Sequence, residues 1–184
     1  MATAQGLQHP PVGLPAPDFQ AMGADGKAHR LSDYAGRIVV LEWTSPVCPY
    51  TALKYRHGLM QALQAGAARA GAVWLSVNTS TPVRPGYLTA QTARARVRQT
   101  GAQVTEFLLD TDGALGRAYG ARTTPQMVVI DRSGVLAYRG ALDDDPSRDR
   151  PGKGDYVTAA LADLSQGRAV RTPEVRPYGC AVEY

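Results

Sequence analysis

The fold is decided by the stretch Ile38-Val39-Val40-Leu41-Glu42-Trp43-Thr44-Ser45-Pro46-Val47-Cys48-Pro49-Tyr50-Thr51. Its apolar, β-branched start predicts a strand over 37–43 that is buried on both faces of a sheet. After a short turn, Pro49 suits the first position of a helix. Cys48 is therefore expected at a helix N-terminus, where free N–H groups and the helix dipole favour the thiolate. Such sites lower a cysteine pKa from about 8.5 to roughly 3.5–7.5, which makes the sulfur a nucleophile.

Strands and helices alternate outward from this stretch. Further strands are predicted at 72–78, 107–110, 126–131 and 135–140. Helices are predicted at 49–66, 88–100 and 156–166, with a brief helix around Leu115 and Tyr119 and one helical turn starting at Ser32 or Asp33. A short hairpin is expected to straddle Gly23–Lys27. This order predicts an α/β fold with a central mixed sheet flanked by helices on both faces.

The length of 184 residues with 44 % hydrophobic content fits one sizeable domain. We expect an extended lead-in over 1–13, a domain over 14–166 and a surface tail over 167–184. No apolar run is long enough for a membrane span. The first residues lack a signal-peptide pattern, so the sequence as it stands predicts a cytoplasmic protein, or a periplasmic or other extracytoplasmic one if a leader was removed.

Charge and metal-ligating residues exclude several functions. The net charge is +4, and Arg94, Arg96 and Arg98 are interpreted as the solvated face of a helix, so nucleic-acid binding is not predicted. Two cysteines, Cys48 and Cys180, are too few for a disulfide scaffold. The three histidines are scattered, and no Cys-His cluster has zinc spacing. Neither a metal nor a cofactor is expected.

Glu42 is the second residue with chemical interest, because it lies within a strand otherwise made of apolar residues. A buried carboxyl has a raised pKa and could move protons for a thiol at the end of the same strand. The alternative is a glutamate that faces water at the strand edge or pairs with an arginine.

Thr123-Thr124-Pro125 is the third feature, because the proline immediately precedes a predicted buried strand. Proline is tolerated at the first residue of a strand, where a cis peptide bond is one plausible device. In that geometry the preceding backbone could line a site and bind an extended thiol substrate. The alternative is an ordinary trans proline that starts the strand.

Together these motifs resemble the thioredoxin-like superfamily, specifically its redoxin branch, which includes the peroxiredoxins of the AhpC/TSA type. The resemblance covers roughly residues 14–166. It rests on the acid Glu42 before the cysteine, on Cys48-Pro49-Tyr50-Thr51 as a CxxC motif with its second cysteine replaced, and on Thr124-Pro125 before a strand. The order and spacing of the three signals indicate this fold.

The resemblance also suggests roles for particular residues. Thr51 replaces the second cysteine, and its hydroxyl could donate to the Cys48 thiolate. Ser45 stands where peroxiredoxins carry a Thr or Ser, whereas Leu41 stands where they carry a proline. Arg122 is the nearest candidate for their peroxide-polarising arginine. The residues predicted to contact substrate are Pro125, Thr124, Pro49 and Trp43.

Cys180 completes the predicted chemistry. A peroxide-oxidised Cys48 becomes a sulfenic acid, which condenses with a second thiol. A mobile Cys180 is a reasonable resolving partner, within one chain or across a homodimer, and an external thiol would then reduce the disulfide. The alternative is a free or purely structural cysteine. The sequence thus favours a peroxiredoxin-like antioxidant, with a thiol–disulfide oxidoreductase acting on protein or small disulfides, or a non-catalytic binding module, as alternatives.

Overall fold

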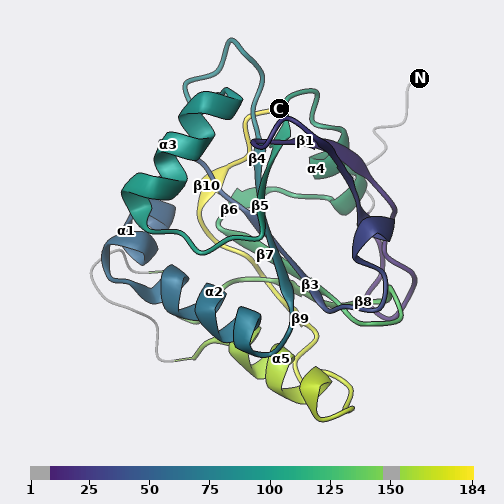
Figure 1. Ribbon diagram of the computed structural model, residues 1–184. Helices are drawn as coiled ribbons and strands as arrows, with labels where there is room; N and C mark the ends of the chain where they lie inside the picture. Colours follow the sequence, from purple (N-terminus) through teal and green to yellow (C-terminus); the bar gives the residue numbers. More distant parts are fainter. Residues whose placement is uncertain (1–8, 147–153) are drawn as a thin grey trace, which may run out of the picture.

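A central mixed sheet organises the computed structural model, which describes residues 9–146 and 154–184 (Figure 1). The sheet has eight strands in the order β2-β1-β5-β4-β3-β7-β8-β9. They are β1 (Gln20–Gly23), β2 (Ala28–Arg30), β3 (Val39–Trp43), β4 (Val73–Thr79), β5 (Glu106–Asp110), β7 (Gln126–Ile130), β8 (Leu136–Gly140) and β9 (Glu174–Val175). Strands β3, β4 and β5 run parallel, whereas β7 is antiparallel to β3. The predicted mixed sheet is confirmed.

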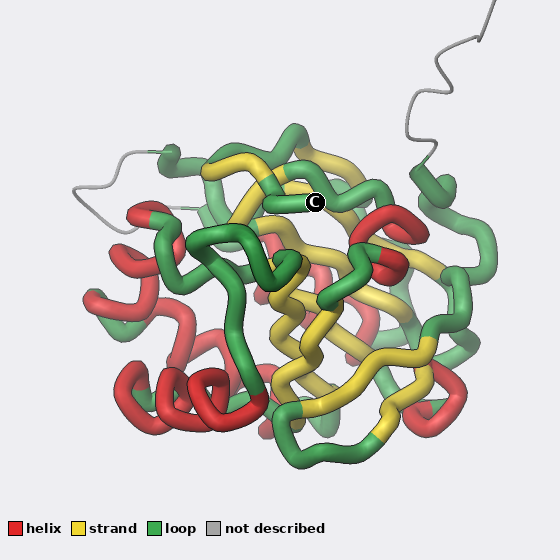
Figure 2. Tube along the Cα trace, turned by 90° about the horizontal axis from the view of Figure 1, so that it is seen from above, coloured by secondary structure: helices red, strands yellow, loops and turns green. Residues whose placement is uncertain are grey.

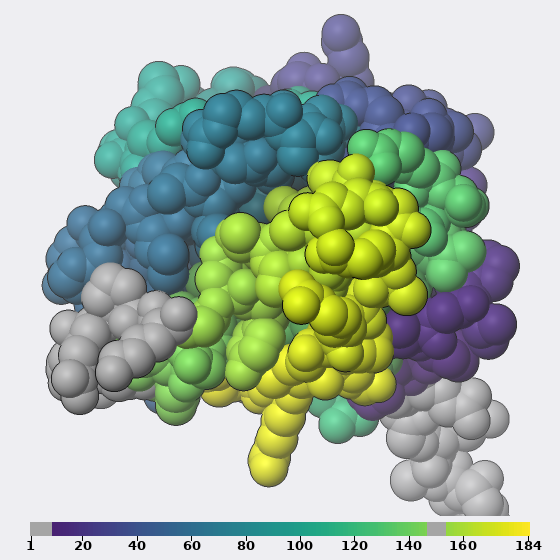
Figure 3. Space-filling model, turned by 90° about the horizontal axis from the view of Figure 1, so that it is seen from below, coloured from purple at the N-terminus to yellow at the C-terminus, as the bar shows by residue number. Residues whose placement is uncertain are grey.

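Helices cover both faces of this sheet. They are the 3-10 helix η1 (Leu31–Tyr34), α1 (Pro49–Arg56), α2 (Leu59–Arg69), α3 (Ala90–Thr100), α4 (Ala114–Tyr119) and α5 (Tyr156–Ser165). Figure 1 shows α1, α2 and α3 together on one side of the sheet and α4 on the other. Figure 3 shows α5 and the residues after it in yellow-green, next to the blue α1–α2 region.

The single helix predicted over 49–66 is wrong. The chain forms two helices instead, and Gly58 between them has a φ of 72°. Glycine adopts this left-handed conformation without the steric cost that a side chain would impose. The break redirects the chain, so that α2 continues to Arg69 and packs beside α5.

Among the described residues, the two larger of three apolar clusters lie on opposite faces of the sheet. On β3, Val40 points into a core with residues of α1, α2 and α5, while Leu41 and Trp43 point into a core with residues of α4. This is the period of two expected of a strand, with both faces buried as the continuous apolar run predicts. Glu42 falls on the same face as Val40, beneath α1 and α2.

The C-terminal tail, predicted as a surface segment over 167–184, lies on the surface with exposed and half-buried residues and pairs with strands of the fold. Strand β9 pairs in parallel with β8. Strand β10 (Cys180–Ala181) pairs antiparallel with β6 (Thr123–Thr124), the residues just before Pro125. Figure 2 shows the C-terminus lying against the body of the molecule. In the described ranges, no helix has the length and apolar character needed to cross a membrane.

Candidate active site

Cys48 occupies the junction between β3 and α1, as the sequence predicts. It is the residue that caps α1, with Pro49 at the start of the helix, and it is 1 % exposed. Its sulfur lies 3.0 Å from the backbone oxygen of Thr124. The peptide bond between Thr124 and Pro125 is cis, so the cis alternative for this proline is confirmed. The register of β3 with β7 brings these two segments together, because Trp43 lies opposite Gln126.

Cys180 lies against Cys48, with their Sγ atoms 2.6 Å apart. The approach follows from strand pairing, because Cys180 lies directly opposite Thr124 in the β10–β6 ladder. A position 132 residues further along the chain is thus held at the N-terminus of α1. Cys180 is half-buried, whereas Cys48 is enclosed. The arrangement places the two sulfur atoms where a disulfide can form or open.

The surroundings of Cys48 favour its ionised form. Burial raises the pKa of the thiol, but hydrogen bonding with Cys180, with Thr124 and with the backbone and side chain of Thr51 lowers it by more, so the pKa lies below its ordinary value. This is the direction that the helix N-terminus predicts. The Thr51 side chain is fully buried at the first turn of α1.

Glu42 is fully buried, which excludes the water-facing alternative. Its carboxylate accepts hydrogen bonds from Ser76 Oγ at 2.7 Å, Trp74 Nε1 at 2.9 Å and Tyr55 Oη at 3.0 Å, and a longer one from Gln64. Burial raises the pKa of Glu42, and these hydrogen bonds only partly offset that rise. The raised pKa suits a proton carrier, but its direct partners belong to β4, α1 and α2 rather than to Cys48. Its proton-shuttle role stays a prediction.

Two predicted site residues lie elsewhere. Trp43 is fully buried against Tyr119 of α4, so its predicted contact with substrate is wrong. The alternation of side chains along β3 turns Trp43 away from the face that carries Glu42. Arg122 is exposed and lines a surface hollow with His9 and Arg139, so it is not the arginine beside the cysteine pair.

Arg96 on α3 is the arginine that sequence reasoning missed. It is half-buried, its guanidinium lies 3.5 Å from the backbone oxygen of Ser45, and its charge acts on Glu42 and Cys48. The expectation that all three helical arginines form a solvated face is therefore wrong for Arg96. Its burial depends on how α3 packs, and three alternating arginines in a sequence do not reveal which one faces inward.

The remaining predicted residues lie around the sulfur pair. Ser45 is buried in the turn before Cys48, and its hydroxyl accepts a hydrogen bond from Val47 N at 3.4 Å. Thr124 is buried beside Cys48, and Pro125 is buried at the start of β7. Pro49 is exposed at the first turn of α1.

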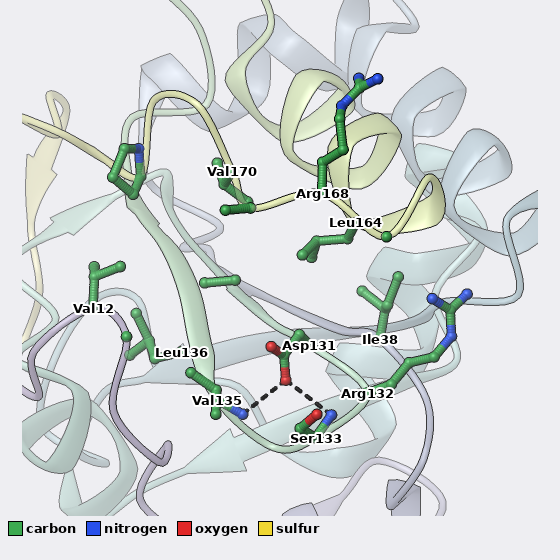
Figure 4. Close-up of a pocket in the computed structure, with 15 residues that line it drawn as sticks. Val12, Ile38, Asp131, Arg132, Ser133, Val135, Leu136, Leu164, Arg168 and Val170 are labelled. Atoms are coloured by element: carbon green, nitrogen blue, oxygen red, sulfur yellow. Dashed lines mark hydrogen bonds between the residues drawn. The ribbon is translucent and has the colours of Figure 1, made fainter.

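Other concave or ligand-like features lie apart from the cysteines. A hollow of about 580 Å³ lies between α5 and the β7–β8 turn, and Val12, Ile38 and Leu136 are among its apolar lining residues (Figure 4). The Asp131 carboxylate closes that turn by accepting hydrogen bonds from Ser133 N at 2.9 Å and Val135 N at 3.0 Å (Figure 4). A cluster of three possible metal ligands lies on the β1–β2 hairpin and the start of β5: Asp25, His29 and Glu106. In this cluster His29 Nε2 forms a hydrogen bond with Asp25 Oδ1 at 3.1 Å.

The fold is similar to those of several solved structures. An uncharacterized conserved protein from Geobacillus kaustophilus is 25% identical, with a TM-score of 0.84 over 95% of this chain and 92% of that chain. A hypothetical protein from Sinorhizobium meliloti is 25% identical, with a TM-score of 0.80 over 96% of both chains. The exposed lipoprotein thioredoxin Etrx1 of Streptococcus pneumoniae is 25% identical, with a TM-score of 0.54 over 82% of this chain and 99% of that chain.

The chain is thus a mixed α/β protein of thioredoxin-like fold, as predicted. The model of the AhpC/TSA family matches residues 12–139, and the chain belongs to that family. No curated protein matches it. Family and fold together support a thiol oxidoreductase.

Proposed function

We propose that this protein reduces peroxides with Cys48 as the nucleophile and Cys180 as the resolving thiol. The observation that carries the proposal is the 2.6 Å separation of the two sulfur atoms. It is supported by the lowered pKa of Cys48, because the thiolate is the reactive form. Membership of the AhpC/TSA family is consistent with this chemistry.

The first step forms a sulfenic acid. The Cys48 thiolate attacks one oxygen of the hydroperoxide, a sulfur–oxygen bond forms and the O–O bond breaks. The leaving oxygen takes up a proton and departs as water or an alcohol. The positive charge of Arg96, which acts on Cys48, would stabilise negative charge that develops on that oxygen. Thr51 contributes a side-chain hydrogen bond to the same sulfur.

The second step closes the disulfide. The Cys180 thiol attacks the sulfenic sulfur, the S–S bond forms, and the hydroxyl group of the sulfenic acid leaves as water. Two equivalents of an external thiol then restore the dithiol. The first attacks Cys180, which is the more exposed of the pair, and expels Cys48 as the more stable thiolate leaving group.

Thiol–disulfide exchange is the second candidate, and one observation favours it. Strand β10 pairs with the residues before the cis-proline, which demonstrates that an extended cysteine-bearing segment fits beside Cys48. In that reaction Cys48 would attack a substrate disulfide, and Cys180 would release the reduced product as Cys48–Cys180 closes.

Rapid-mixing kinetics separate the two candidates. The reduced protein is mixed with hydrogen peroxide in one series and with glutathione disulfide or insulin in another, while thiol loss is followed. We expect peroxide to oxidise Cys48 orders of magnitude faster than free cysteine, and Cys48→Ser to remove the reaction. A rate with peroxide no greater than that of free cysteine contradicts the proposal, and turnover of disulfides alone supports the second candidate.

A further inference from the structure

The edge of β6 beside the active site is already paired with β10 of the same chain. Cys180 and Ala181 pair with Thr124 and Thr123. The pairing continues with Val182 N, which donates to the backbone oxygen of Arg122 at 3.0 Å. An extended chain that carried its own cysteine to Cys48 by strand addition would need these same backbone groups. We name residues 178–184 the closing segment.

Gly179 lets the closing segment approach very closely. A Cβ atom at this position would lie 2.0 Å from the backbone oxygen of Thr124. The residue also has a φ of 135°, a backbone conformation that favours glycine. The two backbones therefore meet with no room for another chain between them.

One anchor of the closing segment lies on its N-terminal side. The Tyr178 hydroxyl donates a hydrogen bond to Asp143, which forms a buried ion pair with Lys54 of α1 at 2.6 Å. The Tyr178 ring also packs against Tyr50, with ring centroids 5.9 Å apart. The helix that carries Cys48 at its N-terminus thus also holds the segment that carries Cys180.

A second anchor lies on the C-terminal side. The Glu183 carboxylate accepts hydrogen bonds from Gly86 N at 2.8 Å and from Ser80 Oγ at 2.9 Å. The Tyr184 hydroxyl donates to the backbone oxygen of Ala121 at 2.8 Å, and Arg117 lies 4.9 Å over the ring. Neither anchor involves sulfur, and both are present here with Cys48 and Cys180 as free thiols.

The polar groups around the sulfur suit a small ligand. The hydroxyl of Thr124, whose backbone oxygen lies 3.0 Å from the Cys48 sulfur, is buried and makes no hydrogen bond within the described residues. Buried polar groups of this kind are normally satisfied by protein or by a small bound molecule. A peroxide offers oxygen atoms that can accept and donate at such a site.

We propose that the closing segment is a specificity device that shuts the cis-proline edge to extended protein segments and restricts the oxidants of Cys48 to small molecules. This inference rests on the proposed function in one respect, since Cys48 must be the nucleophile. Tyr178, Gly179 and Glu183 are then residues that determine specificity without touching the oxidant.

The test compares two probes with the same leaving group in the Cys180→Ser background, where Cys48 is the only remaining cysteine. One probe is the mixed disulfide of thionitrobenzoate with cysteine methyl ester, and the other is its mixed disulfide with a cysteine-bearing decapeptide. The Cys48 thiolate attacks the probe disulfide, forms a new S–S bond with the cysteine of the probe and releases coloured thionitrobenzoate. The absorbance of released thionitrobenzoate gives the rate for each of the two probes directly.

We expect the small probe to react at least tenfold faster than the peptide probe while the closing segment is anchored. Adding Tyr178→Phe removes one anchor hydrogen bond, and Glu183→Gln replaces the charged acceptor of the other anchor by a neutral amide oxygen; each change is worth roughly two- to tenfold in the docking equilibrium. The peptide rate should rise toward the small-probe rate, and the ratio should fall. Glu174→Gln is the matched control, because it removes the same charge from β9, where Glu174 pairs with Arg139 at 3.0 Å.

A ratio near one in the anchored protein overturns the inference, and so does a ratio that Tyr178→Phe with Glu183→Gln leaves unchanged. Failure of both probes to react contradicts the proposed nucleophile itself, and the inference falls with it. The two failures are distinguishable, because an unfolded sample of the same variant reports the intrinsic reactivity of the thiol toward each probe.

Discussion

The two cysteines reach the same point by different means. Cys48 lies where the central strand β3 enters α1, and its position depends on the sheet and on local helix capping. Cys180 lies near the end of the chain, in a strand of two residues held by side-chain anchors and by pairing with β6. The position of the nucleophile is therefore encoded locally, whereas that of its partner depends on contacts across the whole chain.

Replacing each cysteine by serine should give the largest difference between the two positions, because the two cysteines act in different steps of the oxidation. Cys48→Ser should abolish reaction with peroxide, because the nucleophile is lost. Cys180→Ser should leave the first oxidation intact and stop the protein at the sulfenic acid of Cys48. Trapping with dimedone followed by mass spectrometry distinguishes them. Equal loss of the first oxidation step in both variants would contradict the separate roles.

Removing the buried cation tests how the tail is tied to α1. In Lys54→Met, Asp143 keeps a buried charge without its partner, which should destabilise the protein by about 3–5 kcal/mol. Urea unfolding measures this. Arg168→Met is the control: Arg168 is half exposed, and Asp163 keeps Arg171 as a second partner, so this variant should lose much less stability. Similar small losses in both variants would contradict the anchoring role of the Lys54–Asp143 pair.

Gly179→Ala tests the close approach of the tail to β6. The added Cβ would collide with the backbone oxygen of Thr124 at a φ of 135°, so we expect a loss of roughly 1–3 kcal/mol. Disulfide closure after peroxide treatment should also slow. Gly66→Ala in α2 is a control that should raise the free energy of unfolding, because its Cβ would meet only Arg69 at 3.7 Å and alanine favours the helix. Unchanged stability and closure in Gly179→Ala would contradict the model of a tightly docked tail.

Glu42 gives the smallest predicted effect, visible as a pH dependence of stability. Burial raises its folded pKa above the ordinary value of 4.5, so its stabilising contribution is complete below that pH. It is lost as pH rises through the folded pKa. Glu42→Gln should remove this loss, so the stability difference between variant and wild type should shift in favour of the variant with rising pH. Urea unfolding at several pH values checks the slope, and parallel pH profiles would count against the raised pKa.

Periodicity and motif spacing predicted the part of the site that is local in sequence. Cys48 at the start of α1, the buried Glu42 and the cis-proline before β7 can each be recognised from the residues immediately around them. The two short strands of the tail lack such a signal, because pairs of residues have no periodicity. Arg96 and the break at Gly58 were also missed, since both depend on how helices pack. These are tertiary effects that local propensity does not contain.

Stoichiometric oxidation tests the central claim most directly. The reduced protein is treated with one equivalent of hydrogen peroxide, its remaining thiols are alkylated, and the intact mass and peptides are analysed. The account predicts a monomer in which Cys48 and Cys180 are joined to each other and neither is alkylated. An alkylated Cys180 beside an oxidised Cys48, or a disulfide between two chains, would contradict it.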